Sequence, residues 1–330
     1  MQFRRLGKTG FDVSEVSLGT WQVGGKWGSA FDDKGAERIL HEAVDSGINF
    51  IDTADVYEDG QSEAAVGRVV RSRTEHVYVA TKCGRKISPH VSEGYTPQVL
   101  RQHVEESLRN TGLETLDLVQ LHCPPTEVYY RPEIFELFEK LKTEGKIRNL
   151  GVSVEKVEEA LKAVEYPNVH TVQIIYNIFR QRPAELFFEQ AAKKDVGVIV
   201  RVPLASGLLT GKFGATTRFG EGDHRFFNRK GEAFDRGETF AGIDFDLGLE
   251  LVEELKEICS GCPNGTMAQL AIRWILMNTH VSTVIPGASK PEQMLNNIGA
   301  SELPPIDPET LDRIHRLYRE RVRPLVHHLW

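Results

Sequence analysis

The chain has 330 residues, and its 40 lysines and arginines are outnumbered by 47 aspartates and glutamates, which gives a formal net charge of −7. Hydrophobic residues make up 40% and charged residues 26%, a balance that excludes global disorder. The acidic balance gives no reason to expect nucleic acid or an anionic membrane surface as the main partner. No apolar run approaches the roughly 18 residues that a membrane-spanning helix needs, and the basic start leads into no apolar segment of a secretory signal.

The four cysteines are Cys83, Cys123, Cys259 and Cys262. A chain of this length does not depend on disulfides for its core, and so few cysteines suit a reducing cytoplasm, which is the expected location. Cys259 and Cys262 have the spacing of a metal or redox pair. They lack a second pair and lie in a helix-like stretch rich in Glu and Lys, so we interpret them as reduced structural cysteines and expect no metal site.

In chain order, the residues Met1–Ser14 predict a small β-hairpin that turns at Lys8-Thr9-Gly10. Eight short apolar runs follow, several of them almost uninterrupted, as expected of parallel strands buried on both faces. The expected strands are Val16–Gly19, Asn49–Asp52, Val77–Lys82, Leu116–His122, Ile147–Val152, Thr171–Tyr176, Gly197–Val202 and Ser282–Pro286. Between them, apolar residues recur at helical spacing, so an amphipathic helix is expected after each strand.

Four helix starts carry recognisable capping signals. Thr96-Pro97 and Asp307-Pro308 each place a capping side chain before a proline of the first turn. Thr266–Gln269 and Ser289–Glu292 each have the spacing of a capping box.

Eight strand–helix units in one chain favour a closed (β/α)8 barrel, a TIM barrel, formed by residues 1–330 as a single α/β domain. The alternative is a doubly wound nucleotide-binding domain followed by a second domain. That alternative needs a glycine fingerprint, and neither GxGxxG nor GxxxxGK[ST] occurs in the sequence. One segment is too long for an ordinary strand-to-helix connection, namely Ala205–Asp244 after the seventh strand. It is either a surface excursion or a lid.

Chemically capable side chains follow three consecutive strands at their carboxyl ends, which is where barrel enzymes place their active sites. They are Asp52, Tyr57, Lys82 and His122. A tyrosine has an ordinary pKa near 10 and donates a proton poorly unless its phenolate is stabilised, which a neighbouring lysine ammonium would do. A buried ammonium in turn needs a carboxylate, and Asp52 is the nearby candidate. A neutral His122 could orient a substrate carbonyl by donating a hydrogen bond. The four residues predict a proton-donating carbonyl site without a reductant of its own.

Four ordered motifs together resemble the aldo-keto reductase family. They are Asp52-Thr-Ala-Asp-Val-Tyr57, Ala80-Thr-Lys82, Leu116-Asp-Leu-Val-Gln-Leu-His122 and Gly145-Lys-Ile-Arg-Asn-Leu-Gly-Val-Ser153, and the resemblance extends to about Ala300. It implies a barrel that binds NADP(H) without a Rossmann fold. It also implies that hydride passes between nicotinamide and a carbonyl carbon while Tyr57 acts as the general acid or base, in either direction. Lys82 and Asp52 tune Tyr57, and His122 orients the substrate.

The same resemblance implies a set of cofactor contacts. They are Gly19, Thr20, Trp21, Asp52, Ser153, Gln173, Arg201, Pro203, Leu204, Ser206, Gly207, Leu209, Lys212, Ile285, Gly287, Ser289, Lys290, Gln293, Asn296 and Asn297. Ser289–Glu292 begins a helix, and free N–H groups at a helix start favour an anion. Because Lys290 lies beside that start and suits a 2′-phosphate, NADP(H) is expected in preference to NAD(H).

Two positions depart from the family pattern. Val154 stands where an asparagine is common and cannot hydrogen-bond an amide through its side chain. Arg201 stands where a tyrosine often stacks on the nicotinamide. A guanidinium plane can also stack on a ring, but its charge alters the electrostatics felt by an oxidised cofactor.

Two other functions remain open at this point. One is an aldolase-type barrel in which Lys82 forms a Schiff base. The other is a cofactor-binding regulatory subunit with little turnover, as in the potassium-channel β-subunits that resemble the same family.

The expected partner is a small carbonyl or alcohol substrate, with no nucleic acid and no membrane, and the oligomeric state stays open. Substrate choice is expected to depend on loops. They are Trp21–Phe31, Arg85–Tyr95, Pro124–Arg131 and Arg218–Arg236. Trp21, Trp27 and Phe31 could form an apolar wall, and Arg218, Arg225 and Arg229 could contact an anion. The tail Arg321–Trp330 is expected near the barrel mouth or a neighbouring subunit.

Overall fold

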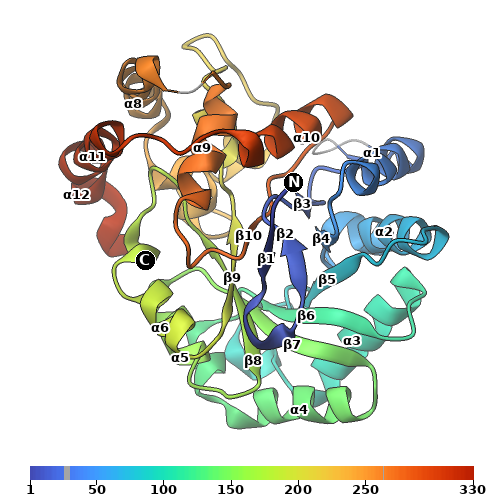
Figure 1. Cartoon of the computed structure of the whole chain (residues 1–330). Coiled ribbons are helices and arrows are strands. Elements are labelled where there is room, and N and C mark those ends of the chain that lie inside the picture. Colours follow the sequence, from blue (N-terminus) through green and yellow to red (C-terminus); the bar gives the residue numbers. More distant parts are fainter. Residues whose placement is uncertain (26–29, 263) are drawn as a thin grey trace.

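A computed structural model describes residues 1–25, 30–262 and 264–330. Eight parallel strands stand side by side in the order of the sequence and form the barrel seen in Figure 1. They are β3 (Leu18–Gly19), β4 (Phe50–Asp52), β5 (Tyr78–Cys83), β6 (Leu116–His122), β7 (Ile147–Ser153), β8 (Val169–Ile175), β9 (Gly197–Arg201) and β10 (Thr283–Val284). Single parallel bridges join Val16 to Val284 and Gly19 to Gly287, so the first and last strands close the ring. The expected (β/α)8 barrel is confirmed.

The expected hairpin is also present. β1 (Phe3–Arg5) pairs antiparallel with β2 (Asp12–Ser14), and Gly10 near its turn has the left-handed φ of 79° that glycine adopts without strain. A small cluster of buried side chains places Leu6, Phe11 and Val13 against strand residues such as Phe50 and Leu118. The hairpin therefore packs its apolar side chains on the barrel interior.

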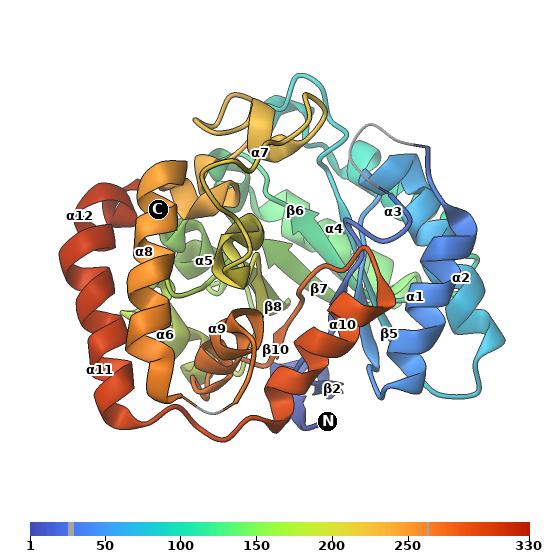
Figure 2. The same ribbon diagram turned by 90° about the horizontal axis from the view of Figure 1, so that it is seen from above.

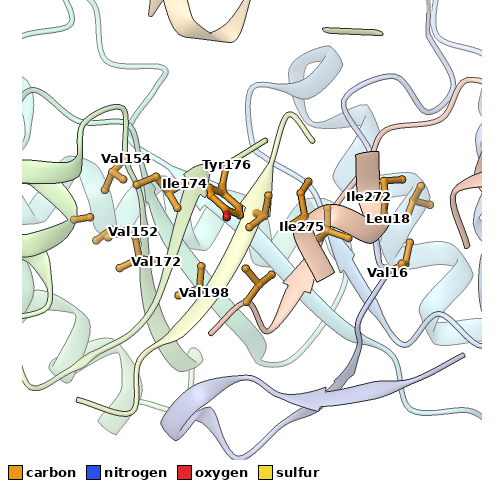
Figure 3. Packing of buried hydrophobic residues seen from close by; sticks show 14 of the residues in the cluster. Val16, Leu18, Val152, Val154, Val172, Ile174, Tyr176, Val198, Ile272 and Ile275 are labelled. Atoms are coloured by element: carbon orange, nitrogen blue, oxygen red, sulfur yellow. The ribbon is translucent and has the colours of Figure 1, made fainter. Parts of the chain in front are cut away.

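Helices surround the strands and bury their apolar faces against them. Those described are α1 (Asp33–Asp45), α2 (Gln61–Ser72), α3 (Pro97–Thr111), α4 (Pro132–Thr143), α5 (Val157–Ala163), α6 (Phe187–Lys193), α7 (His224–Phe227), α8 (Phe245–Ile258), α9 (Met267–Leu276), α10 (Pro291–Ile298), α11 (Pro308–Leu317) and α12 (Arg323–Val326). Neighbouring strands place valines in register, and their side chains are part of the buried packing seen in Figure 3. These valines are Val152, Val172 and Val198. Among the described residues, no helix is both long enough and apolar enough to cross a lipid bilayer.

Three of the four expected caps are confirmed. Thr96 and Asp307 accept hydrogen bonds from the third residue of α3 and α11, and Thr266 with Gln269 forms a capping box. The fourth prediction is wrong, because α10 begins only at Pro291, after an extended Lys290 with φ −149° and ψ 148°. The ring of a proline disfavours helical geometry in the residue before it.

The segment from Ala205 to Asp244 contains short helical turns instead of one long loop. They are η6 (Ala205–Thr210), α7, η7 (Arg236–Glu238) and η8 (Phe240–Gly242). Phe213, Phe219, Phe240 and Phe245 pack their rings together at its base, with centroids 5.0–6.5 Å apart. Figure 2 shows the part with α7 beyond one end of the strands. The segment thus lies across the barrel opening, the position of a lid.

Candidate active site

A cavity of about 1120 Å³ opens at the carboxyl ends of the strands, between the barrel and the segment that carries α7. This volume exceeds the roughly 300–1,000 Å³ of a site for one drug-sized ligand. Most residues expected to contact the cofactor line it. They are Gly19, Thr20, Trp21, Asp52, Ser153, Gln173, Arg201, Pro203, Leu204, Ser206, Gly207, Lys212, Ile285, Gly287, Ser289, Gln293, Asn296 and Asn297.

Lys82 is the centre of the candidate catalytic cluster. It lies near the end of β5, and its side chain is only 1% exposed. Its Nζ donates hydrogen bonds to a carboxylate oxygen of Asp52, to the backbone oxygen of Thr53 at 2.9 Å and to the hydroxyl of Tyr57 at 3.3 Å. Burial lowers the pKa of Lys82, but Asp52 and Tyr57 together raise it by more than burial lowers it. The net pKa of Lys82 therefore lies above its ordinary value. Lys82 is therefore an ammonium at neutral pH.

Asp52 is held by strand residues on both of its carboxylate oxygens. Oδ1 faces Lys82, and Oδ2 accepts hydrogen bonds from Gln120 at 2.9 Å and Gln173 at 2.7 Å. Gln120 is a site residue that the sequence reasoning missed. It pairs in register with Lys82 and lies two residues before His122, on the same face of β6. The two-residue period of a strand was the signal that could have found it.

Tyr57 lies in the loop after β4 and opens a tight turn, η2 (Tyr57–Gly60), in which Glu58 and Asp59 have positive φ values of 47° and 51°. Such strained backbone is characteristic of functional sites. The Lys82 ammonium lies 4.9 Å from the centre of the Tyr57 ring. Burial raises the pKa of Tyr57 and Lys82 opposes this rise, with a net pKa above its ordinary value. Tyr57 is thus a neutral phenol at neutral pH, not a phenol acidified below 10.

His122 ends β6 and turns its ring edge-on to Tyr57, with centroids 6.1 Å apart and planes at 85°. Burial and then the charge of Lys82 hold the pKa of His122 well below its usual range. Within the described part of the chain, its buried Nδ1 has no hydrogen-bond partner. His122 is therefore a neutral imidazole, which can donate one hydrogen bond and accept another.

Arg201 joins the barrel to the long segment. It forms an ion pair with Glu238 at 2.8 Å, and its Nη2 donates to the backbone oxygen of Val154 at 3.0 Å and to the sulfur of Cys123 at 3.6 Å. Val154 thus helps to hold the Arg201 guanidinium through its backbone carbonyl group, although its side chain cannot form a hydrogen bond. Cys123, Glu155 and Glu238 are close enough to hold a metal ion, but the Arg201 guanidinium contacts two of them and would repel a cation.

Ser153 and Gln173 lie side by side on β7 and β8, as register partners. The Ser153 hydroxyl donates to the side-chain oxygen of Gln173 at 3.5 Å, and both residues line the cavity beside Asp52. A hydroxyl and an amide at this depth suit an uncharged amide ligand.

Two expected cofactor contacts do not face the cavity in the part of the chain described. Leu209 is fully buried in the main hydrophobic core, within η6. Lys290 is exposed and is absent from the described lining, whereas Glu292 lines the cavity. Gln293 accepts hydrogen bonds from the Ser289 backbone at 2.9 Å and from the Ser289 hydroxyl at 3.1 Å, so Ser289 bonds to Gln293 and not to Glu292 of the expected capping box.

An aromatic wall faces Tyr57 from across the cavity. The Trp21 ring lies 6.3 Å from Tyr57, 5.0 Å from His224 and 6.3 Å from Phe234, and all of these residues line the cavity. Phe31, the other expected wall residue, packs on the core and against Gly24. Trp27 lies outside the described residues.

The basic residues of the loops are distributed unevenly. Arg85 and Arg225 line the cavity, whereas Arg218 and Arg229 are absent from its described lining. Arg225 also forms an ion pair with Asp223 at 2.6 Å, and the Arg229 guanidinium stacks 5.3 Å from the Phe245 ring.

Comparison with known proteins agrees with this geometry. The chain is 30% identical over 305 residues to the oxidoreductase YqkF of Bacillus subtilis, covering 91% of each chain. It is 30% identical over 314 residues to the NADH-specific methylglyoxal reductase of Escherichia coli, covering 89% of this chain and 92% of that protein. The structure of glycerol dehydrogenase AKR11B4 from Gluconobacter oxydans superposes with a TM-score of 0.79 at 30% identity, over 97% of this chain and 96% of that one. The model of the aldo/keto reductase family matches residues 15–319, and with the barrel, the motifs and these relatives it shows that the chain belongs to the aldo/keto reductase family of oxidoreductases.

Proposed function

We propose that this enzyme reduces aldehydes or ketones to alcohols, or catalyses the reverse oxidation, with a nicotinamide dinucleotide as cofactor and Tyr57 as the general acid or base. The observation that carries the proposal is the position of Lys82, whose ammonium contacts both Asp52 and the Tyr57 hydroxyl beside a neutral His122. A bound nicotinamide would supply the hydride, which amino-acid side chains do not provide.

The cavity fits such a cofactor at both ends. Ser153 and Gln173 offer a hydroxyl and an amide to a carboxamide. Hydroxyl and amide side chains also line the end near α10, where Ser289, Asn296 and Asn297 suit a ribose and an adenine. Lys212 and the glycine-containing turn of η6 also line the cavity and suit phosphates.

The proton is handled by Tyr57 and its neighbours. In the reduction, His122 donates a hydrogen bond to the carbonyl oxygen and the Tyr57 hydroxyl gives that oxygen its proton. The phenolate left behind is stabilised by Lys82, whose own charge is balanced by Asp52. In the oxidation the same groups work in reverse, and the phenolate takes the proton from the alcohol.

A Schiff base on Lys82 is disfavoured by the same contacts. Its three hydrogen bonds go to acceptors, and its raised pKa keeps the nitrogen protonated. A nucleophilic lysine needs a lowered pKa instead.

The pH dependence of the rates follows from the shifted pKa values of Tyr57 and His122. Reduction requires the protonated phenol, and since the pKa of Tyr57 is raised, kcat/KM should stay level through neutral pH and fall only as the pH rises through that raised pKa. Oxidation requires the phenolate and should therefore rise steadily toward alkaline pH. Because the pKa of His122 is lowered, protonation of its ring should affect the rates only in acid. Rates measured in both directions between pH 5 and about 11 check this expectation.

We also propose that NADP(H) is favoured over NAD(H), by a narrow margin. Lys212 and Arg225 supply positive charge to the cavity, whereas Glu292 at its α10 end opposes a 2′-phosphate. The Escherichia coli relative is named as NADH-specific, so the preference of this chain has to be measured with both cofactors.

Replacing Glu292 with glutamine should increase the ratio of kcat/KM for NADPH to that for NADH by several-fold, on the order of 1 kcal/mol of removed repulsion. Lys290→Met is the matched control, since the exposed Lys290 does not line the described cavity. Initial rates with both cofactors test the pair. A fall in the ratio for Lys290→Met larger than the rise for Glu292→Gln would contradict the assignment.

The reaction itself is tested by incubating the purified protein with NADPH or NADH and a panel of small carbonyl compounds that includes methylglyoxal and glyceraldehyde. We expect loss of absorbance at 340 nm and formation of the alcohol, and the reverse with glycerol and oxidised cofactor. Tight cofactor binding without turnover on any of these compounds would instead support a regulatory cofactor-binding subunit.

A further inference from the structure

Arg180 is a fully buried guanidinium that lies beside the active site without lining the described part of the cavity. It follows β8 in a turn that closes through backbone hydrogen bonds with Asn177. Its Nη1 donates to Asp235 at 3.2 Å, and its Nη2 donates to the backbone oxygen of Glu155. The guanidinium carbon lies 3.9 Å from the centre of the Trp330 ring, which is itself only 3% exposed.

The segment from Phe234 to Gly242 packs directly on these two side chains. A Cβ atom at Gly237 would lie 1.9 Å from Nη1 of Arg180. At Gly242, which has a φ of +76°, a Cβ atom would lie 2.5 Å from Cη2 of Trp330. Asp235 also accepts a hydrogen bond from the Gly237 backbone at 3.0 Å, which shapes the turn between the two contacts. Only glycine permits approaches this close.

The other face of the same segment reaches the active site. Phe234 lines the cavity and lies edge-on to Trp21, the ring that faces Tyr57. Glu238 lines it too and pairs with Arg201 at 2.8 Å. The contacts therefore run without a gap from Trp330 through Arg180 and Asp235 to the wall of the cavity.

We propose that Trp330 and Arg180 are positioning residues that hold residues 234–238 against the active site and so set the affinity for the nicotinamide cofactor, an inference that rests on the proposed function. Stacking of the indole covers one face of the guanidinium and excludes water from it. A charge pair in such a dry environment is stronger than one at the surface. Trp330 thus strengthens the Arg180–Asp235 pair without touching the ligand.

The test compares four variants with the wild type. Trp330→Ala removes the stacking ring, and Trp330→Phe keeps an aromatic face on Arg180. Asp235→Asn breaks the ion pair with little change in shape, so it tests the same contact if Trp330→Ala does not fold. Phe138→Ala is the matched control, because it removes a ring that is 1% exposed from α4, outside the described lining of the cavity.

Two measurements are made on each folded variant. The dissociation constant is measured by calorimetry, using whichever of NADPH and NADH binds the wild type more tightly. Trp330→Ala and Asp235→Asn should weaken binding about tenfold, which corresponds to about 1.4 kcal/mol, with a smaller change in kcat than in KM for the cofactor. Hydrogen exchange of residues 228–242, measured without cofactor, should become faster in the same two variants. Trp330→Phe should stay near the wild type.

Each outcome decides between a positioning and a purely structural role. If Phe138→Ala lowers the melting temperature as much as Trp330→Ala and weakens cofactor binding equally, the role is only structural and the proposal is overturned. Unchanged binding and exchange in Trp330→Ala and Asp235→Asn would overturn it as well. A wild type that binds neither cofactor would refute the proposed function instead, and the exchange measurement would still report whether Trp330 holds the segment.

Discussion

Tyr57→Phe should lower kcat/KM for carbonyl reduction by about 10²–10⁴-fold, the usual contribution of a positioned general acid. The ring remains to pack against Trp21 and His122, and only the hydroxyl next to Lys82 is lost. Because the proton donor is missing only at the chemical step, the loss should fall on kcat, while the dissociation constant of the cofactor stays near that of the wild type. Steady-state rates combined with calorimetric titration of cofactor separate the two effects.

Tyr95→Phe is the matched control for that change. Tyr95 is also fully buried, its hydroxyl has no hydrogen-bond partner among the described residues, and it is absent from the described lining of the cavity. Its replacement should leave kcat/KM unchanged. Activity of Tyr57→Phe within a few-fold of the wild type would rule out Tyr57 as the general acid, and His122 would then be the next candidate proton donor.

Lys82→Met should lose activity and stability together. It leaves Asp52, which is 2% exposed, as a buried carboxylate without a counter-ion. Breaking a buried pair in this way typically lowers the free energy of unfolding by about 3–5 kcal/mol. The phenolate of Tyr57 also loses its stabilising charge, so kcat should fall by a factor similar to that of Tyr57→Phe.

The double variant Asp52→Asn with Lys82→Met distinguishes the two losses. Replacing the carboxylate with an amide removes the uncompensated charge, and the asparagine oxygen can still accept from Gln120 or Gln173. Urea unfolding should therefore show much of the lost stability restored, while activity stays absent. Recovery of activity in the double variant would contradict a role for the Lys82 charge in catalysis.

Much of the fold could be predicted because its signals are local. Each apolar run and each capping residue acts over a few positions, so the strands were located to within about two residues, as is usual for element boundaries, and three caps were correct. The fourth cap failed on a competing local rule, the effect of Pro291 on the residue before it.

The candidate catalytic cluster could be predicted for a related reason. In a parallel barrel the carboxyl ends of adjacent strands meet at one face, so Asp52, Lys82 and His122 had to converge once the strands were correctly placed. The direction of the Tyr57 pKa could not be predicted in this way. The direction of this pKa shift depends on how completely the folded chain excludes water from the Tyr57 hydroxyl. Exclusion of water raises the pKa, and it outweighs the lowering by Lys82.

By itself, then, the sequence determined the barrel, the order of its strands and the residues proposed to move the proton, because strand periodicity and motif spacing encode them locally. Only the tertiary structure decided which groups from distant segments meet at the cavity. Glu238 pairs with Arg201, Glu292 replaces Lys290 in the lining, and Trp330 covers Arg180. These contacts depend on how a long irregular segment folds across the barrel, and no short-range pattern specifies that packing.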